Sequence, residues 1–326
     1  TGNTISAIGT LVASGNVTLG DSGALTINGK LAAPNIVIDP AAAPASVTVS
    51  GSLGADALVS LTSTGAINLI SGALVTGTGI TLAGGGAISV GGGAVLGTTA
   101  ATVGLATTGG GVTESAGGII RAAALVPGAI SGTVDLAGVA NTIAALGAVT
   151  VTGGDFTLDT TGSLAVNGAL NAGNIALSSA TLGIHADLTA SNSVALVGGS
   201  GGIALDHTIS GSTLALGSGG GITEAATTKL QTPTLISAGT LSGAVDLSAG
   251  DNSISTLGNL SASGAAVTLT DGGVAALVVS GPVQVGSLTL NGVPAIGVTG
   301  GITASGEVSL AAGASGIAFG AASVVS

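Results

Sequence analysis

The feature that most constrains this chain is a long internal repeat. The segment from Asn3 to Ile38, NTISAIGTLVASGNVTLGDSGALTINGKLAAPNIVI, returns between Asn141 and Leu177 as NTIAALGAVTVTGGDFTLDTTGSLAVNGALNAGNIAL. A looser third copy runs from Asn252 to Leu290. A repeat of this length marks an architecture in which each unit packs on a copy of itself. We therefore expect an elongated stack of strands.

Short segments inside the repeat alternate apolar and polar residues. They are VTL at 17–19, LTI at 25–27 and IVI at 36–38. Such alternation predicts strands with one buried face. The intervening GDSG, NG and AAPN are rich in turn-forming residues, so we expect turns there. Glycine and β-branched residues recur too often for helices.

The spacing of equivalent apolar positions predicts the length of one coil. The chain returns to an equivalent inward position every 19 to 21 residues, as from Val17 to Ile36, from Phe156 to Ile175, from Val47 to Ile67 and from Val267 to Leu288. A strand–turn–strand–turn unit of this size buries its apolar face only by stacking on other units. The sequence thus predicts a parallel β-helix, or β-solenoid, of roughly 16 coils about 4.8 Å apart. Its expected hand is right-handed, the rule for parallel crossovers.

The sequence also contains a repeat that is longer than one coil. GGGVTE at 109–114 returns as GGGITE at 219–224, and SGTVDL at 131–136 returns as SGAVDL at 242–247. We expect one continuous solenoid over residues 1–326, built from three modules of which the last is incomplete: 1–140, 141–251 and 252–326.

Composition excludes several classes of partner. The chain has three Lys and Arg residues against 14 Asp and Glu, for a net charge of −11, so binding to nucleic acid or to an acidic membrane surface is excluded. Gly, Ser and Thr interrupt each apolar run well before 18 residues, so no membrane-spanning segment is expected. Position 1 is not Met. We therefore expect a processed piece whose export signals lie outside it.

The repeat also resembles a known family. The pattern GNVTL…GALTINGxLxAxNI is similar to the repeats of filamentous haemagglutinin-type adhesins, which are large bacterial exoproteins exported by two-partner secretion, and to passengers of related autotransporters. This resemblance implies a right-handed β-helix that is secreted or displayed on the surface of a Gram-negative bacterium. The family's secretion domain, with its Asn-Pro-x-Gly type motif, has no counterpart here, so an outer-membrane transporter is implied only for the parent protein.

Few residues are candidates for chemistry. Asp206 and His207, with Ser210, offer a carboxylate, an imidazole and a hydroxyl, but adjacency in sequence is not the geometry of a catalytic triad. We expect an exposed turn there. His185 alternates with Ile184 and should face solvent. A metal site at His185 would need a second histidine and acids on neighbouring coils.

Acidic residues recur at matching positions of the modules. Asp135 and Asp246 each lie between inward-facing Val and Leu, so both should point outward. They are either calcium or ligand positions or, as we expect, solvated charges that oppose sideways association. Glu114 with Arg121, and Glu224 with Lys229, are expected to form surface ion pairs of little energetic value.

Glycine-rich segments mark tight corners. We expect positive φ angles in the runs 109–111, 198–202 and 219–221, and in the Asn-Gly pairs at 28–29, 167–168 and 291–292. Replacing Gly29 or Gly168 with valine should therefore destabilise its coil.

The sequence predicts no catalytic, cofactor-binding or metal-binding residue. The expected function is a non-enzymatic structural segment of an extracellular bacterial fibre or adhesin, which displays a tip or self-assembles into filaments or matrix. The alternative is a module that binds host or surface glycans directly, although the chain has only two aromatic residues to serve as sugar platforms. A β-helix enzyme that degrades polysaccharides is a third and weaker possibility, because acids are scattered and Arg is single.

Overall fold

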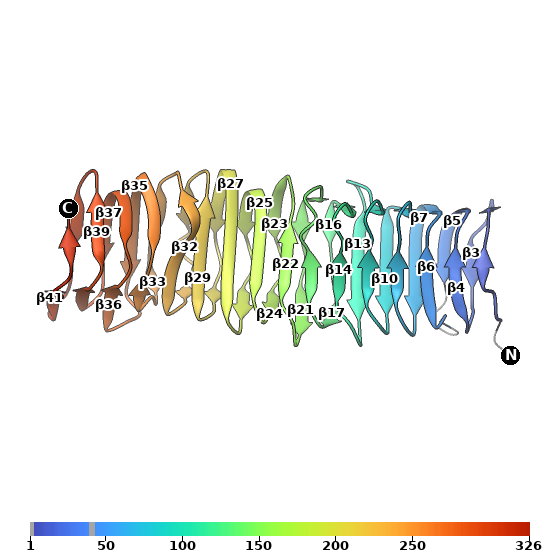
Figure 1. Cartoon of the computed structure of the whole chain (residues 1–326), viewed down its shortest axis with the longest axis horizontal. Coiled ribbons are helices and arrows are strands. Elements are labelled where there is room, and N and C mark those ends of the chain that lie inside the picture. The colour runs from blue at the N-terminus through green and yellow to red at the C-terminus, as the bar shows by residue number, and fades with distance from the viewer. Residues whose placement is uncertain (1–2, 39–42) are drawn as a thin grey trace. The chain divides into compact units, whose positions relative to one another are not determined.

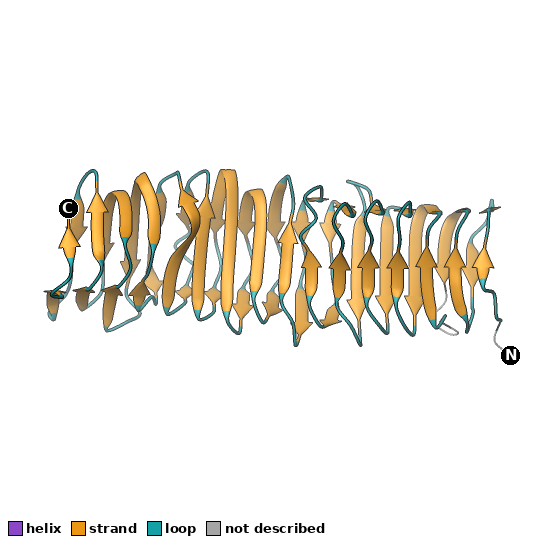
Figure 2. Ribbon diagram, viewed as in Figure 1, coloured by secondary structure: helices purple, strands orange, loops and turns teal. Residues whose placement is uncertain are grey.

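The computed structural model describes residues 3–38 and 43–326. These residues form 42 strands joined by turns and bends, with no helix among them (Figures 1 and 2). The strands are parallel and stack coil on coil into a β-solenoid of about 15 turns. The predicted fold class is confirmed. Within the described ranges there is also no helix long and apolar enough to cross a membrane.

The chain divides into two compact units, Thr1–Gly162 and Ser163–Ser326. In the first unit each coil contributes to three stacks of strands, which we name sheets A, B and C. Sheet A contains β1 (Ala7–Ile8), β4 (Ala24–Ile27), β6 (Ser46–Val49), β8 (Ile67–Leu69), β11 (Ile88–Val90), β14 (Val112–Glu114), β18 (Val134–Leu136) and β22 (Phe156–Asp159).

Sheets B and C complete the coils of the first unit. Sheet B contains β2 (Leu11–Val12), the first parts of β5 (Lys30–Ile38) and β7 (Ser52–Ser63), β9 (Leu74–Thr76), β12 (Val95–Gly97), β15 (Ile119–Ala122) and β19 (Thr142–Ile143). Sheet C contains β3 (Val17–Leu19), the last parts of β5 and β7, β10 (Gly79–Gly84), β13 (Thr102–Thr107), β16 (Ala124–Leu125), β17 (Ala129–Ser131), β20 (Ala145–Leu146) and β21 (Val149–Thr152).

The second unit repeats the scheme with longer strands that turn corners. One stack contains β23 (Ser163–Val166), the ends of β25 (Ile175–Ile184) and β27 (Ser193–Leu205), β30 (Ile222–Glu224), β33 (Val245–Asn252), the ends of β35 (Leu260–Asp271) and β37 (Val283–Asn291), and β40 (Val308–Leu310). Another contains the starts of β25 and β27, β29 (Thr213–Ser218), β32 (Thr234–Leu241), β34 (Thr256–Leu257), β36 (Ala276–Val279), β38 (Ala295–Val298) and β41 (Gly316–Phe319).

Two shorter stacks complete the second unit. The first contains β24 (Leu170–Ala172), β26 (Leu188–Ala190), β28 (Ile209–Ser210) and β31 (Leu230–Gln231). The second contains the starts of β35 and β37, β39 (Gly301–Ala304) and β42 (Val324–Val325).

Aliphatic ladders fill the interior of each unit. In sheet B of the first unit, Leu31, Leu53, Val75, Leu96 and Ile120 occupy successive coils in register, and all are fully buried. Each side chain therefore packs on a like side chain above and below it. Burying a large aliphatic side chain in this way stabilises the fold by about 1.5–3 kcal/mol. This explains why a core without Met or Trp is sufficient.

The coil differs from the sequence prediction in two respects. It has three strands, not two, because Lys30–Ala33 forms a strand of sheet B; the AAPN segment lies where β5 then turns into sheet C and its register with β7 shifts. Its length also varies more than expected. Val17 pairs with Ile36 after 19 residues, as predicted, but Ile88 pairs with Val112 only after 24. Extra residues are accommodated in corner turns, which the ladder does not constrain.

Most glycines at the corners are required by close packing between coils and not by φ. The φ prediction is correct for Gly292 and Gly202, but no positive φ occurs at Gly29 or in the runs 109–111 and 219–221. A Cβ on Gly29 would instead lie 2.6 Å from the backbone nitrogen of Thr10 in the preceding coil. The expected cost of substitution at Gly29 thus remains, with a different cause.

We predict that Gly110→Ala destabilises the first unit, because its Cβ would lie 2.6 Å from the backbone nitrogen of Ala87. Overpacking against backbone should cost about 2–3 kcal/mol. The matched control is Gly104→Ala, whose Cβ would meet its nearest atom at an ordinary 3.6 Å. Chemical denaturation followed by circular dichroism measures both. Equal stability of the two variants would contradict the close-approach explanation.

Candidate functional site

Buried and half-buried polar side chains form a hydrogen-bonded cluster at one corner of the first unit, which we call polar corner 1. Glu114 ends β14, and its Oε2 accepts hydrogen bonds from the backbone N–H of Gly138 at 2.9 Å and from Nδ2 of Asn141 at 2.8 Å. Asn141 Oδ1 in turn accepts from the N–H of Ile120 at 2.7 Å. One coil further on, Thr160 Oγ1 accepts from the N–H of Ile143 at 2.9 Å. The three acceptor side chains, which lie in successive coils, therefore satisfy backbone donors in two coils.

The second unit contains the same arrangement, which we call polar corner 2. Glu224 ends β30, and its Oε2 accepts from the N–H of Ala249 and from Nδ2 of Asn252, both at 3.0 Å. Asn252 Oδ1 accepts from the N–H of Leu230 at 3.0 Å. Asp271 then occupies the position of Thr160, with its Oδ2 accepting from the N–H of Ile254 at 2.6 Å.

A shorter version stands at the start of the chain. Asp21 Oδ1 accepts from the N–H of Ile5 at 3.1 Å, and the carbonyl oxygen of Asn3 accepts from the N–H of Ser22. The carbonyl oxygens of Asn141 and Asn252 accept equivalent bonds one coil on. The three asparagines that begin the sequence repeats therefore hold equivalent structural positions. The sequence interpretation used these asparagines as landmarks and assigned them no role.

The glutamates of the two corners are electrostatically unusual. Burial raises the pKa of Glu224 from 4.5 to about 7; its hydrogen bonds from Asn252 and Ala249 oppose the rise, and the nearby charge of Asp246 adds to it. Burial also raises the pKa of Glu114, with Asp135 as the like-charged neighbour. Among the described residues, Oε1 of each glutamate is buried and accepts no hydrogen bond. An oxygen without a donor stabilises negative charge poorly, which is consistent with both shifts.

The predicted ion pairs of these glutamates are wrong. Within residues 3–38 and 43–326, Glu114 forms no salt bridge with Arg121, and Lys229 pairs with Asp251 at 3.2 Å instead of Glu224. Each glutamate carboxyl turns inward because unpaired backbone N–H groups at the corner need an acceptor. By contrast, Asp135 and Asp246 are exposed between buried Val and Leu, as predicted.

The histidine–carboxylate pair in the second unit is not the one adjacent in sequence. Nδ1 of His185 lies 2.5 Å from Oδ2 of Asp206, and both side chains are partly exposed. The separation of 21 residues is one coil, so stacking brings the two side chains together. His207 is exposed in the turn, as expected. Ser210 donates its hydroxyl to the carbonyl of Leu188 at 3.4 Å, so it does not complete a triad with the pair.

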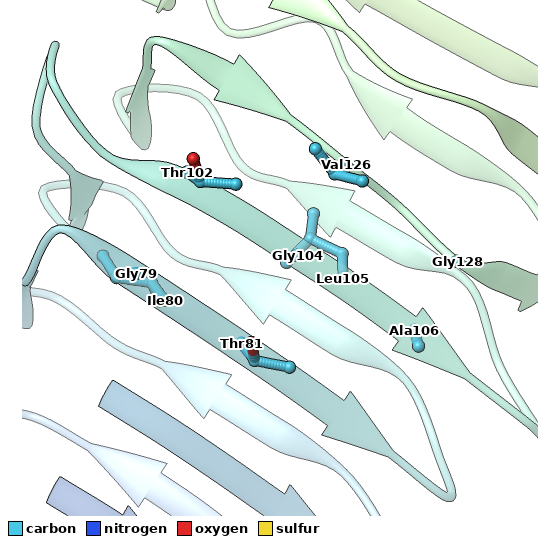
Figure 3. Close-up of a pocket in the computed structure, with 9 residues that line it drawn as sticks. All are labelled: Gly79, Ile80, Thr81, Thr102, Gly104, Leu105, Ala106, Val126 and Gly128. Carbon is cyan, nitrogen blue, oxygen red and sulfur yellow. The ribbon is translucent and has the colours of Figure 1, made fainter. Parts of the chain in front are cut away.

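Two shallow hollows lie on sheet C of the first unit. One, of about 400 Å³, is lined by outward residues of β10 and β13, including Thr81, Thr102 and Gly104, and by Val126 from the next coil (Figure 3). The other, of about 560 Å³, lies beside it and shares Ala106. The sequence interpretation did not anticipate either hollow.

Comparisons do not assign these features. No protein-family model, curated protein or solved structure matches the chain. In the part of the chain that the structure describes, no three His, Asp or Glu side chains gather in a way that could hold a metal ion. The polar corners are the clearest constellation, and their chemistry is the capping of backbone donors and the uptake of a proton.

We predict that Asn252→Ala destabilises the second unit by about 2–3 kcal/mol, because it leaves the buried N–H of Leu230 without an acceptor and removes a donor from Glu224. The control is Asn259→Ala, an exposed asparagine in the same unit, which should change stability by less than ~0.5 kcal/mol. Denaturant titrations of both variants measure the difference. Similar losses in the two variants would contradict a role for the corner.

We also predict that stability rises as the pH falls from 8.5 to 5.5. The folded pKa of Glu224, about 7, lies above its unfolded value of 4.5, so the folded protein binds the proton more tightly in this window. The stabilisation is lost as the pH rises through 7. Glu224→Gln, which mimics the protonated acid, should raise the melting temperature at pH 8.5 and make the melting temperature depend less on pH.

The control for this experiment is Glu307→Gln, which removes an exposed carboxylate from the same unit. It should leave the slope of melting temperature against pH unchanged. A slope that is equally steep in Glu224→Gln and in the native chain would show that the buried glutamate does not set it.

Proposed function

We propose that the chain is a non-enzymatic structural segment of an extracellular bacterial surface fibre or adhesin of the filamentous haemagglutinin type. In this role the solenoid acts mechanically, as a stiff spacer that displays a tip or assembles into filaments or matrix. The parent protein would leave a Gram-negative cell through an outer-membrane transporter. The observation that carries the proposal is the repeated module, with the same polar corner at Glu114 and Glu224.

Repeated corners support a mechanical role because each one satisfies buried backbone groups without a ligand. A backbone N–H left unpaired inside the stack would cost about 1–3 kcal/mol and would be a point of local opening. Continuous ladders and an aliphatic interior then resist proteolysis, since cleavage needs the backbone to open.

The use of the carboxyl groups supports a non-enzymatic function. Among the described residues, the acids with raised pKa values are Glu114, Glu224 and Asp271, and each accepts hydrogen bonds from backbone N–H groups. A general acid or base needs reach to a substrate proton. These carboxyls are instead engaged by the fold.

A second candidate function is direct binding of glycans along the solenoid. The hollow of about 400 Å³ on sheet C favours it, because Thr81 and Thr102 bring hydroxyl groups to its rim. Its other lining residues are small or aliphatic, however, and sugar sites usually add aromatic faces and several polar groups.

We expect the purified chain to appear in negative-stain electron microscopy as narrow rods or filaments and to survive limited proteolysis at 37 °C. Glycan-array binding by a monomeric chain would favour the second candidate instead. The structural proposal would be contradicted by compact particles that are digested rapidly by thermolysin, a protease that does not require Lys or Arg at the cleavage site. Trypsin itself is a poor probe, because the chain offers only three Lys and Arg residues.

A further inference from the structure

Charge is distributed unequally over the three sheets of the first unit. Strands of sheet A carry Glu114, Asp135 and Asp159, and strands of sheet B carry Lys30 and Arg121. In the described part of this unit, no strand segment of sheet C contains a charged residue, from β3 to β21. Asp56 lies at the corner where β7 turns from sheet B into sheet C. Sheet C is therefore a neutral face on a chain of net charge −11.

Sheet C also carries a knob beside a hollow. The Val126 side chain is 44% exposed and has a glycine in the coil on each side of it. A Cβ on Gly104 would lie 3.6 Å from the carbonyl oxygen of Val126, and one on Gly147 would lie 3.3 Å from its Cγ1. Figure 3 shows Val126 standing across from Gly104 on the neighbouring strand. Val126 therefore projects beyond the neighbouring coils, where Gly104 and Gly147 have no side chains.

The fold does not require the hollow of about 400 Å³ beside Val126. Gly79, Gly104 and Gly128 line it, and none has a positive φ. A Cβ on any of the three would meet its nearest atom at 3.6 Å, an ordinary contact. Alanine or a larger residue could stand at these positions without straining the coil. The hollow is thus separate from the close-packed corners, where glycine is obligatory.

We propose that sheet C of the first unit is a docking surface for the same sheet of a second copy of this chain, with Val126 of each copy seated in the hollow at Gly104 of the other. This inference rests on the proposed function, of which it specifies the self-association surface. A two-fold interface needs a surface that is complementary to itself, and a knob next to a hollow on one face meets that need.

Charge favours a second copy as the occupant. Two chains that each carry −11 repel one another, and burying a carboxylate between them without a partner costs several kcal/mol. Sheet C is the face of the first unit that joins two copies without burying a strand charge. Its small outward side chains also permit two sheets to approach closely, as in stacked flat sheets.

The area of the surface sets the expected strength. Six neighbouring coils, about 4.8 Å apart, each cross sheet C with about six residues, which gives on the order of 600 Å² per copy. Two copies would bury about 1,200 Å², the lower end of the range for specific interfaces. We therefore expect a reversible, concentration-dependent dimer that becomes stable when several copies are held side by side.

Cysteine cross-linking tests the pairing directly, because the native chain has no cysteine. A mixture of Val126→Cys and Gly104→Cys chains should form a mixed disulfide dimer under mild oxidation, since a disulfide needs Cα atoms within about 7 Å. The control mixture, Thr26→Cys with Thr48→Cys, places its thiols on paired positions of sheet A and should not cross-link between chains beyond random collision.

A charge placed on the face tests its energetics. Thr81→Glu, on an exposed position of β10, should weaken dimerisation at least tenfold in sedimentation equilibrium, because two like charges would meet in the interface. Thr48→Glu on sheet A is the control and should not change the mass distribution. Raising the salt concentration should leave the native dimer intact or strengthen it, since screening reduces repulsion between the copies.

The outcomes separate this proposal from the proposed function. If the chain associates but Thr81→Glu does not weaken it and the cysteine pair does not cross-link, sheet C is not the contact and the fibre function stands. If the chain is monomeric and Thr81→Glu abolishes binding to immobilised glycans, the face is a sugar site and the docking proposal is overturned. A chain that stays monomeric up to ~1 mM also overturns it, while electron microscopy still decides the fibre function.

Discussion

The structure depends on the hydrogen-bonded contact between the backbones of successive coils. Parallel strands about 4.8 Å apart leave no room for a Cβ where one corner lies directly over another. Gly29 and Gly110 lie at such places. A Cβ added to either residue would lie less than 3 Å from the backbone of the preceding coil. Stacking therefore requires glycine at these two positions, whose φ angles are ordinary. Loop length can vary at the corners while the strands between them stay in register.

The same stacking creates the need for the polar corners. Where the chain leaves a strand, backbone N–H groups point into the stack and lose their ladder partners. A short acceptor on the next coil, such as Asn141 or Asn252, replaces the missing carbonyl. Glu114 and Glu224 then hold each asparagine amide in place. Burial of these carboxyls raises their pKa values, so titration near neutral pH is a by-product of capping the coil.

Much of the fold could be predicted from the sequence, because strand alternation and coil spacing are local properties. The pairing of Val17 with Ile36 follows from spacing alone. The third strand of the coil could not be predicted, since the short segment Lys30–Ala33 forms a strand only through pairing with the neighbouring coils. Contacts across coils were missed for the same reason. His185 and Asp206 meet because they are 21 residues apart, a signal that is visible only once the coil length at that point is known.

The comparison of the corners indicates what the fold requires at these positions. Thr160 and Asp271 occupy equivalent places, and each accepts the N–H of an isoleucine, Ile143 or Ile254. A hydroxyl therefore serves where a carboxyl serves, so the position needs an acceptor and not a charge. Because a neutral acceptor avoids the desolvation that raises the pKa of Asp271, the hydroxyl version should depend less on pH. The two corners thus share a geometry but differ in titratable groups, and proton uptake is a property of the individual module.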